Sequence, residues 1–362
     1  MISSKEQIIE YFKTGIKETK NFKIGIEHEK FLFNNEDNKR VNYSKIKEMF
    51  TALLEFGWHP VLEKGNIIGL NKGGKNITLE PGNQIELSGD KLNTIHEACA
   101  ESHDYLFELR QVTKKIGIKI VSAGFDPISK LNEVPNNPKK RYELMTKDMP
   151  EGGELSLDMM YRTCGTQLNI DYNSEQDFIK KFKIVNSIVP ITIALFANSS
   201  IKEKKNSNYL SYRSKVWQNT SRGGLPKSYL EGMNFEKYAD YIMNYPLLFF
   251  KKKNNYLFSK NKTFKDFIEN KIRELDFKGP TKKDLEIHLS TIFTEIRLKK
   301  YIEIRSLDTC EWSCHCAGPA FFLGILYKNL DTALDIIKNW KAEEVLNAYK
   351  EAPKKRIANF AS

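Results

Sequence analysis

The chain places carboxylates inside segments that otherwise have the pattern of buried β-strands, and few folds tolerate this combination. From Ile77 to Gly89 the sequence is ITLEPGNQIELSG, in which apolar and polar residues alternate with the period of a half-buried strand. Glu80 and Glu86 are six residues apart, so an unbroken strand would point both side chains to one face. The intervening Pro81-Gly82-Asn83 predicts a bend or a bulge.

Two further segments repeat this arrangement. GIEHEKFLF contains Glu27 and Glu29, which are two residues apart and therefore share a strand face. KKYIEIRSLD places Glu303 and Arg305 in the same relation. Charged side chains on apolar strands have to be paired or to face an ion or a charged ligand. The three segments therefore predict a charged ligand bound against a sheet.

Size and composition are those of a globular protein. The 362 residues suit one large α+β domain or two intimately joined ones, and 40% hydrophobic and 12% aromatic residues supply a core. The net charge of +11 raises the possibility of a nucleic-acid binder, but the lysines are spread along the chain and no recognisable binding module is present. We therefore expect no nucleic-acid partner, and we assign the charge to solubility and to attraction of anionic substrates.

The N-terminus, the lengths of the apolar runs and the number of cysteines bear on the cellular location. The N-terminus MISSKEQIIEYF is charged and amphipathic, unlike a signal peptide, and no apolar run reaches the ~20 residues that span a bilayer. Five cysteines, an odd number, argue against an extracellular disulfide framework. We expect a cytoplasmic protein with no membrane partner.

The strand-borne carboxylates have the chemistry of a site for a hard cation. Oxygen ligands without a matching set of His and Cys favour Mg²⁺, which takes one or two carboxylates and completes its shell with water and nucleotide phosphates. Five carboxylates would hold two or more ions, and the alternative is a set of solvated strand faces with lysine partners. The candidates are Glu27, Glu29, Glu80, Glu86 and Glu303.

Other polar residues extend this candidate site. Gln167 and Asn169 share a face of the predicted strand TQLNIDY, where they complete the metal shell, bind a substrate or are ordinary sheet residues. Arginine is scarce, and its guanidinium grips carboxylate or phosphate in a bidentate fork. The arginines that stand out are Arg162, Arg213, Arg222 and Arg305.

Residues 202–224 are expected to form a polar loop, in which Trp217 follows Arg213 by four residues and walls the same pocket or packs in the core. The spacing of Cys310, Cys314, His315 and Cys316 fits no structural zinc pattern and lacks a second ligand pair, so we expect no zinc.

Seven segments together resemble a known family in order and spacing. The family is glutamate–cysteine ligase of the plant and proteobacterial type, and the resemblance runs from about residue 20 to residue 350. The segments are GIEHEKF, ITLEPGNQIELSG, RYELMTKDMP, LDMMYRTCGTQLNIDY, ALFANS, YLSYRSKVWQNT and HLSTIFTEIRLKKYIEIRSLD.

The resemblance implies an α+β fold of the glutamine-synthetase-like kind, a cradle made by a curved, mainly antiparallel sheet with helices packed outside. It also implies a single carboxylate–amine ligase catalytic domain over residues 1–362. Because relatives continue beyond this end point, the chain is expected to be a natural short form or a truncated one.

The implied reaction is the first step of glutathione biosynthesis. ATP phosphorylates the γ-carboxylate of glutamate, and the amine of L-cysteine then attacks the γ-glutamyl phosphate. The implied cofactors are Mg²⁺ and the co-substrate ATP. Phosphoryl transfer of this kind needs charge neutralisation and in-line positioning more than covalent chemistry from the protein.

The resemblance also implies a role for each matched residue. Arg305 and Glu303 are the implied catalytic residues, and Lys299, Arg305 and Asn169 the implied nucleotide-binding ones. Arg213 and Trp217 match the glutamate pocket, with Arg213 on the substrate α-carboxylate, and Arg141, Tyr142 and Tyr172 match the side that receives cysteine. The implied magnesium ligands are Glu27, Glu29, Glu80, Glu86, Glu303 and Gln167.

Several alternatives stay open. One is a related ligase that joins glutamate to another amine, and another is a catalytically silent Mg²⁺–nucleotide-binding relative, because Leu248 and the sequence Ser221-Arg222-Gly223-Gly224 depart from the family pattern. Cys99 and Cys316 fall where plant enzymes place a regulatory disulfide, and buried free thiols are the alternative. The implied assembly is a monomer or a redox-dependent homodimer.

Overall fold

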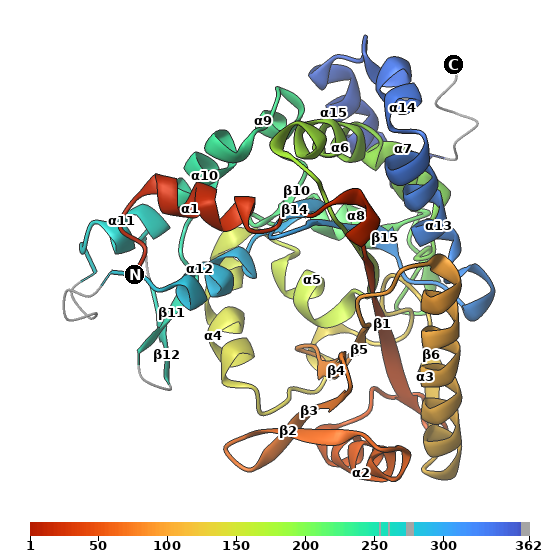
Figure 1. The fold of residues 1–362 in the computed structure, drawn as a ribbon. Coiled ribbons are helices and arrows are strands. Elements are labelled where there is room, and N and C mark those ends of the chain that lie inside the picture. The colour runs from red at the N-terminus through yellow and green to blue at the C-terminus, as the bar shows by residue number, and fades with distance from the viewer. Residues whose placement is uncertain (253–254, 260, 273–278, 356–362) are drawn as a thin grey trace.

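A computed structural model describes residues 1–252, 255–259, 261–272 and 279–355, and its core is a large antiparallel sheet (Figure 1). The strands follow the order β14-β15-β7-β1-β5-β4-β3-β2, with β6 paired to the far half of β1. Every pairing in this sheet is antiparallel. The strands are β1 (Ile24–Asn34), β2 (His59–Glu63), β3 (Asn66–Lys72), β4 (Lys75–Leu79), β5 (Ile85–Ser88), β6 (Ile118–Val121), β7 (Gly165–Ile170), β14 (Ile296–Leu298) and β15 (Ile302–Asp308).

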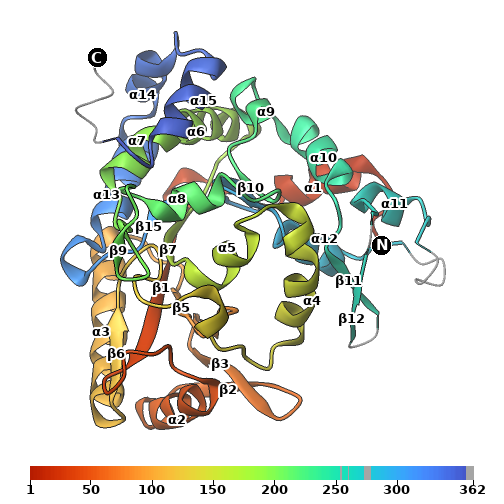
Figure 2. The same cartoon turned by 180° about the vertical axis from the view of Figure 1, so that it is seen from behind.

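Helices surround the sheet, and short strand pairs lie in its connections. In Figure 2, α4 and α5 occupy the middle of the molecule, α2 and α3 lie along one edge, and α6, α14 and α15 along another. The helices are α1 (Lys5–Lys13), α2 (Tyr43–Leu53), α3 (Ile95–Lys115), α4 (Lys140–Asp148), α5 (Ser156–Arg162), α6 (Glu175–Ser187), α7 (Val189–Leu195), α8 (Tyr212–Trp217), α9 (Lys227–Leu230), α10 (Phe235–Asn244), α11 (Phe264–Ile268), α12 (Lys282–Leu289), α13 (Ala317–Leu323), α14 (Leu330–Ile337) and α15 (Ala342–Glu351). The short strands are β8 (Ile201–Lys202), β9 (Lys205–Asn206), β10 (Gly223–Gly224), β11 (Phe249–Lys252), β12 (Asn255–Phe258) and β13 (Phe293–Thr294). The predicted α+β class with a mainly antiparallel sheet is confirmed.

Alternation along β1 separates the core from the polar face of the sheet. Ile24 and Ile26 point into an apolar cluster shared with α1, α6 and α10, and Leu32 joins a second cluster under α2 and α3. Glu27 and Glu29 point to the opposite face, as the period of two requires. Burial of the apolar set, at roughly 25 cal/mol per Å² of apolar surface, fixes this register, since a slip of one residue would drive the carboxylates into the core.

Several helices begin at a side-chain cap that the sequence supplies. The side chains of Asn42, Thr94 and Ser174 accept hydrogen bonds from backbone amides three residues on, at 3.1, 3.2 and 3.1 Å, and so start α2, α3 and α6. Such a cap satisfies one of the amides that the first helical turn leaves unpaired, which stabilises the helix by roughly 1 kcal/mol.

The segment from Ile77 to Gly89 is a hairpin rather than one bent strand. β4 ends at Leu79, β5 begins at Ile85, and the two pair antiparallel with Thr78 opposite Glu86. The predicted bend is confirmed, and Asn83 has the left-handed φ of +61° that such a turn requires. The argument that Glu80 and Glu86 share one strand face is wrong, because Glu80 lies in the turn.

Residues 202–224 are also more ordered than predicted. They contain α8, which begins at the cap Ser211 and carries both Arg213 and Trp217 on one face. The polar composition of this segment hid a helix of six residues that packs against β15 and α5.

Candidate active site

The polar face of the sheet opens into a cavity of about 310 Å³. Strands β1, β5, β7, β14 and β15 form its floor, and side chains from α4, α5 and α8 close it from the other side. The cavity collects most of the residues that the sequence singles out, namely Glu27, Glu29, Glu80, Glu86, Arg141, Tyr142, Gln167, Arg213, Trp217, Lys299, Glu303 and Arg305.

Four of the carboxylates line the cavity as an acidic wall, formed by Glu27, Glu29, Glu80 and Glu86. Sheet register places three of them, and Glu80 lies in the turn before β5. Glu29 lies directly opposite Glu86 on β5, and Glu27 lies opposite Gln167 on β7. The Gln167 amide reaches both neighbours, with Nε2 3.3 Å from Glu29 Oε1 and 3.4 Å from Glu86 Oε2. Residues from three separate strands thus meet on one face, as the spacing of two predicts.

Within the described residues, none of the four acidic-wall carboxylates forms an ion pair, and burial disfavours the charged form of three of them. Burial, followed by the charges of Glu86 and Glu303, raises the pKa of Glu27 to about 7. Burial and the neighbouring carboxylates Glu86 and Glu80 raise the pKa of Glu29 well above its usual range. The pKa of Glu86 is raised for the same reasons, burial first and then Glu80. Carboxylates with raised pKa values, oriented at one another, are the arrangement that a bound cation would stabilise.

The donor set fits Mg²⁺. The donors are carboxylate oxygens, because Gln167 presents Nε2 to Glu29 and Glu86 while its Oε1 accepts from Arg305 Nη1. Gln167 is therefore not oriented as the metal ligand that the resemblance implies, and within the described residues no group of three His, Cys, Asp or Glu side chains could hold a metal. Mg²⁺ usually takes one or two protein carboxylates, so the facing pair of Glu29 and Glu86 is a sufficient anchor.

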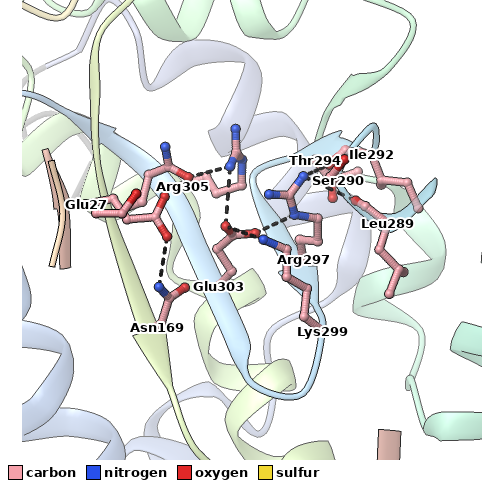
Figure 3. Close-up of polar contacts among 12 residues, drawn as sticks. Glu27, Asn169, Leu289, Ser290, Ile292, Thr294, Arg297, Lys299, Glu303 and Arg305 are labelled. Atoms are coloured by element: carbon pink, nitrogen blue, oxygen red, sulfur yellow. Dashed lines mark hydrogen bonds and ion pairs between the residues drawn. The ribbon is translucent and has the colours of Figure 1, made fainter. Parts of the chain in front are cut away.

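Glu303 differs from the acidic wall because cations surround it (Figure 3). It forms ion pairs with Arg297 through Nε, with Lys299 Nζ at 3.1 Å and with Arg305 Nη1 at 3.6 Å. Burial alone would raise the pKa of Glu303, but these three cations lower it well below its usual range. The prediction that Glu303 is a metal ligand stays untested, and its surroundings suit a carboxylate that holds a basic wall, formed by Arg213, Arg297, Lys299 and Arg305.

Arg213 is a buried cation, and some of its hydrogen-bond donors have no acceptor among the described residues. Its side chain is among the largest that are fully buried, and only Nη2 finds an acceptor, the carbonyl of Arg305 at 2.7 Å. Within the described part of the chain, its Nε and Nη1 have no hydrogen-bond partner. The Trp217 ring lies beneath the guanidinium, with its centroid 4.6 Å from Cζ. A buried guanidinium with two unpaired nitrogens costs free energy until an anion binds it, so this corner suits a substrate carboxylate.

Two residues to which the resemblance assigns a role, Tyr172 and Asn169, do not line the cavity. Tyr172 is fully buried outside the cavity, packs against Phe178 and Phe235, and donates its hydroxyl to the Phe12 carbonyl at 2.7 Å. Tyr172 is therefore not placed to contact a substrate in the cavity, contrary to the role that the resemblance implies. Asn169 is not among the residues that line the cavity, and its Nδ2 donates to Glu27 Oε1 at 2.9 Å, so it positions Glu27 (Figure 3).

Tyr142 on α4 lines the cavity, and its hydroxyl contacts the acidic wall at Glu80. The hydroxyl oxygen lies 2.8 Å from the Leu79 carbonyl oxygen and 3.1 Å from Glu80 Oε1, so its one proton is shared between these acceptors. Arg141, beside it, donates only to the Ser290 carbonyl at 3.3 Å, and Nε has no partner among the described residues. Arg141 is therefore the better placed of the two to contact a substrate.

Other residues of the cavity were not found from the sequence. Arg297 is buried, binds Glu303 and donates to the Leu289 and Ile292 carbonyls at 3.2 and 2.9 Å. It lies two residues before Lys299, and both contact Glu303, so the spacing of two that identified Glu27 and Glu29 would have identified it. Met159, Met160 and Thr163 also line the cavity, and no sequence signal marks them.

Comparison with known proteins supports the family read from the seven motifs. The sequence profile of glutamate–cysteine ligase family 2 matches residues 23–359. The chain belongs to this family. The chloroplastic glutamate–cysteine ligase of Nicotiana tabacum is 42% identical over 347 residues, which cover 94% of this chain and 66% of the tobacco protein. Chloroplastic glutamate–cysteine ligase B of Oryza sativa subsp. japonica is 41% identical over 94% of this chain and 70% of the rice protein.

This member of glutamate–cysteine ligase family 2 thus spans about two thirds of the length of these relatives. A crystal structure of glutamate–cysteine ligase from Francisella tularensis in complex with AMP aligns with 94% of this chain and 73% of that chain, at 15% identity and a TM-score of 0.49. A likeness of this size does not bear on the site.

The comparisons correct one expectation. The relatives from tobacco, rice and Arabidopsis thaliana are all named as chloroplastic, which contradicts the prediction of a cytoplasmic protein made from the composition of this family member. Within the described residues, no helix is both long enough and apolar enough to cross a bilayer.

The structure places the cysteines that the resemblance pairs within bridging distance. Cys99 on α3 and Cys316 are joined, with their Cα atoms 6.2 Å apart, inside the ~7 Å that a disulfide requires. A regulatory role for this bridge in glutamate–cysteine ligase family 2 chains such as this one stays a prediction, as does the assembly state. Cys310 and Cys314 are joined as well, a pairing that the sequence did not suggest.

Proposed function

We propose that the protein catalyses the ATP-dependent joining of the glutamate γ-carboxylate to the amine of L-cysteine, the first step of glutathione biosynthesis. The observation that carries this proposal is one cavity with an acidic wall for metal ions and a basic wall for phosphates and a carboxylate. Membership of glutamate–cysteine ligase family 2 and about 40% identity to enzymes of that name support it. Because the chain spans two thirds of those enzymes, the activity itself is the point to test.

In this proposal Glu27, Glu29, Glu80 and Glu86 hold magnesium, with Gln167 beside them. When bound, the metal would neutralise ATP phosphates against the acidic wall. The protein contributes the opposite charge, because Arg305 and Lys299 line the same cavity and would stabilise the negative charge that develops on the transferred phosphoryl group. Glu303 keeps these cations in place through its ion pairs.

The substrates divide between the two ends of the cavity. Arg213, stacked on Trp217, takes the α-carboxylate of glutamate, and this leaves the γ-carboxylate free to attack the γ-phosphorus with loss of ADP. The amine of cysteine, bound on the side of Arg141, then attacks the carbonyl of the γ-glutamyl phosphate. Phosphate leaves, and the amide bond forms. Arg213 and Arg141 hold the two reactants together, and this positioning is the main protein contribution to the second step.

The test is ADP release by the purified protein with Mg²⁺, ATP and glutamate, with and without cysteine, beside the variant Glu80→Gln. We expect cysteine-dependent ADP release. We expect its rate to be at least about 100-fold lower in the variant, since an amide replaces one acidic ligand. Faster turnover with another amine than with cysteine would identify a related ligase. ATP binding without any γ-glutamyl product would identify a silent relative.

A second prediction concerns the pH dependence of the metal-free protein. The raised pKa of Glu27, about 7, means that the folded state keeps a proton that the unfolded state releases near 4.5. This carboxyl therefore lowers the free energy of unfolding as pH rises from about 5 to 7. The buried histidines His28, His288 and His315, whose pKa values are lowered, act in the opposite direction below pH 6.5. A comparison of wild type with Glu27→Gln isolates the carboxyl.

In EDTA we expect Glu27→Gln to be more stable than wild type at pH 8, with little difference at pH 5. In Mg²⁺ at pH 8 we expect the order to reverse, because the ionised carboxylate then binds the metal. Thermal unfolding followed by fluorescence at the two pH values measures both differences. A variant that is less stable than wild type in EDTA at pH 8 would contradict the prediction.

A further inference from the structure

A buried ion pair outside the cavity holds the turn that separates β4 from β5. Arg40 and Asp126 have fully buried side chains, with Arg40 Nη1 2.9 Å from Asp126 Oδ2. Neither residue lines the cavity. The pair joins the connection between β1 and α2 to the loop after β6, which are far apart in the sequence. An ion pair in such a place is costly to desolvate and contributes little net stability compared with an apolar pair, so its contacts need another explanation.

Arg40 contacts the backbone of the turn between Glu80 and Glu86 and of the neighbouring helix α5. Arg40 donates through Nη2 to the carbonyl of Gly82 and through Nη1 to the carbonyl of Tyr161 at 3.4 Å. The Phe31 ring packs on the guanidinium, with its centroid 4.7 Å from Cζ. Asp126 is fixed in turn, since Oδ1 accepts from the amides of Ile128 and Ser129 at 2.9 and 2.8 Å. The guanidinium therefore has one orientation, set by Asp126 and directed at Gly82.

The turn has little room to settle elsewhere. A Cβ added to Gly82 would lie 2.7 Å from both the Tyr161 carbonyl oxygen and Val134 Cγ1. The Gln84 side chain accepts from the Gly82 amide at 2.8 Å and donates to the carbonyls of Met160 and Thr163 at 3.2 Å each. The turn is therefore pinned between Arg40 on one side and α5 on the other.

The same turn sets the positions of two acidic-wall residues. Glu80 is its first residue, with its amide donating to the Gln84 carbonyl at 2.8 Å, and Glu86 follows two residues after Gln84 on β5. A shift of the Gly82 peptide would move Glu80 directly and Glu86 through the register of β5 with β1. We propose that Arg40 and Asp126 are positioning residues that fix the turn from Glu80 to Glu86 and so set the affinity of the acidic wall for divalent cations.

This inference rests on the proposed function, since it concerns the metal that the proposed reaction uses. Removing partners outside the ligand set typically lowers metal affinity by 10- to 100-fold. We expect Arg40→Met to raise the dissociation constant for Mn²⁺, used as a spectroscopic probe in place of Mg²⁺, by at least about tenfold. Asp126→Asn should act in the same direction, because it frees the guanidinium to turn away from Gly82. Arg40→Lys should lie between Arg40→Met and wild type, since an ammonium keeps the charge but not the fork.

The experiment titrates purified wild type and variants with Mn²⁺ and counts the free ion by electron paramagnetic resonance, with ADP release measured in parallel. The expected kinetic signature is a higher Mg²⁺ concentration at half-maximal rate, with kcat at saturating Mg²⁺ within about threefold of wild type. Lys181→Met is the matched control, because Lys181 is a buried cation outside the cavity that binds Asp177 at 2.8 Å and the Asp171 carbonyl at 2.9 Å. It should lose stability without a change in Mn²⁺ affinity.

The outcomes separate the two proposals. Unchanged Mn²⁺ affinity in Arg40→Met and Asp126→Asn, with wild type binding normally, would overturn the inference and leave the proposed function standing. A wild-type protein that binds no Mn²⁺ would overturn the metal site itself. If Arg40→Met does not fold, Arg40→Lys and Asp126→Asn decide the question by the same titration, since each retains most of the buried contacts.

Discussion

Replacing Arg305 with methionine is expected to lower kcat by about 1000-fold or more, with a much smaller change in the KM for ATP. Arginines that face a transferring phosphoryl group contribute about 1000- to 100,000-fold to phosphoryl transfer, mainly in the transition state. Arg305 suits this role because it is buried, lines the cavity and donates to Gln167, which also contacts Glu29 and Glu86. Its Nε finds no partner within the described part of the chain, so one donor is left for a substrate oxygen.

The matched control is Arg222→Met. Arg222 is also a buried arginine, but its guanidinium donates to the Thr291 carbonyl at 3.0 Å and the Pro246 carbonyl at 2.8 Å, outside the cavity lining. Steady-state ADP release and thermal unfolding are measured for both variants. We expect Arg222→Met to lose stability and to keep kcat within about threefold. Equal losses of kcat in the two variants would show that Arg305 acts through folding rather than on the phosphates.

The sequence predicted the parts of this site that follow from strand alternation. Glu27, Glu29 and Gln167 lie on β1 and β7, where a period of two and two apolar clusters leave one orientation for each side chain. Register then brings Glu86 to Glu29, although the sequence argument for Glu86 assumed a single strand. The prediction succeeded there because β4 and β5 form a hairpin, which returns Glu86 to the same face as the β1 carboxylates.

What the sequence could not show is which residues balance a charge at a distance. Glu303 was grouped with the metal ligands, yet three cations surround it, and one of them, Arg297, was not singled out. Arg40 reaches Gly82 across 42 positions in the chain, and Asp126 reaches Arg40 across 86. Tyr172 was predicted to bind substrate because it lies in a family motif, but its side chain is buried in the hydrophobic core and donates to the Phe12 carbonyl. Long-range pairing of this kind depends on tertiary packing, and no local pattern encodes it.

Replacing Arg213 with methionine is expected to lower kcat/KM for glutamate by at least about 100-fold, with the KM for ATP changed by less than about threefold. Truncating one partner of a buried, hydrogen-bonded charge pair costs about 2–5 kcal/mol, which corresponds to losses from about 30-fold to several thousandfold. Within the described residues, only Nη2 of the Arg213 guanidinium has an acceptor, and the Trp217 ring lies against its flat face. Arg213→Lys should recover part of the loss, because lysine keeps the charge and loses the fork.

The substrate provides a sharper control than a second variant. 4-Aminobutyrate is glutamate without its α-carboxylate, so wild type and Arg213→Met should use it equally poorly if Arg213 binds that group. Measuring kcat/KM for both substrates with both proteins closes a double-mutant cycle in which the second change is made in the ligand. A loss of the same factor for both substrates would show that Arg213 does not contact the α-carboxylate. A loss confined to glutamate would place the α-carboxylate on Arg213 and therefore point the γ-carboxylate toward the phosphates between the two walls.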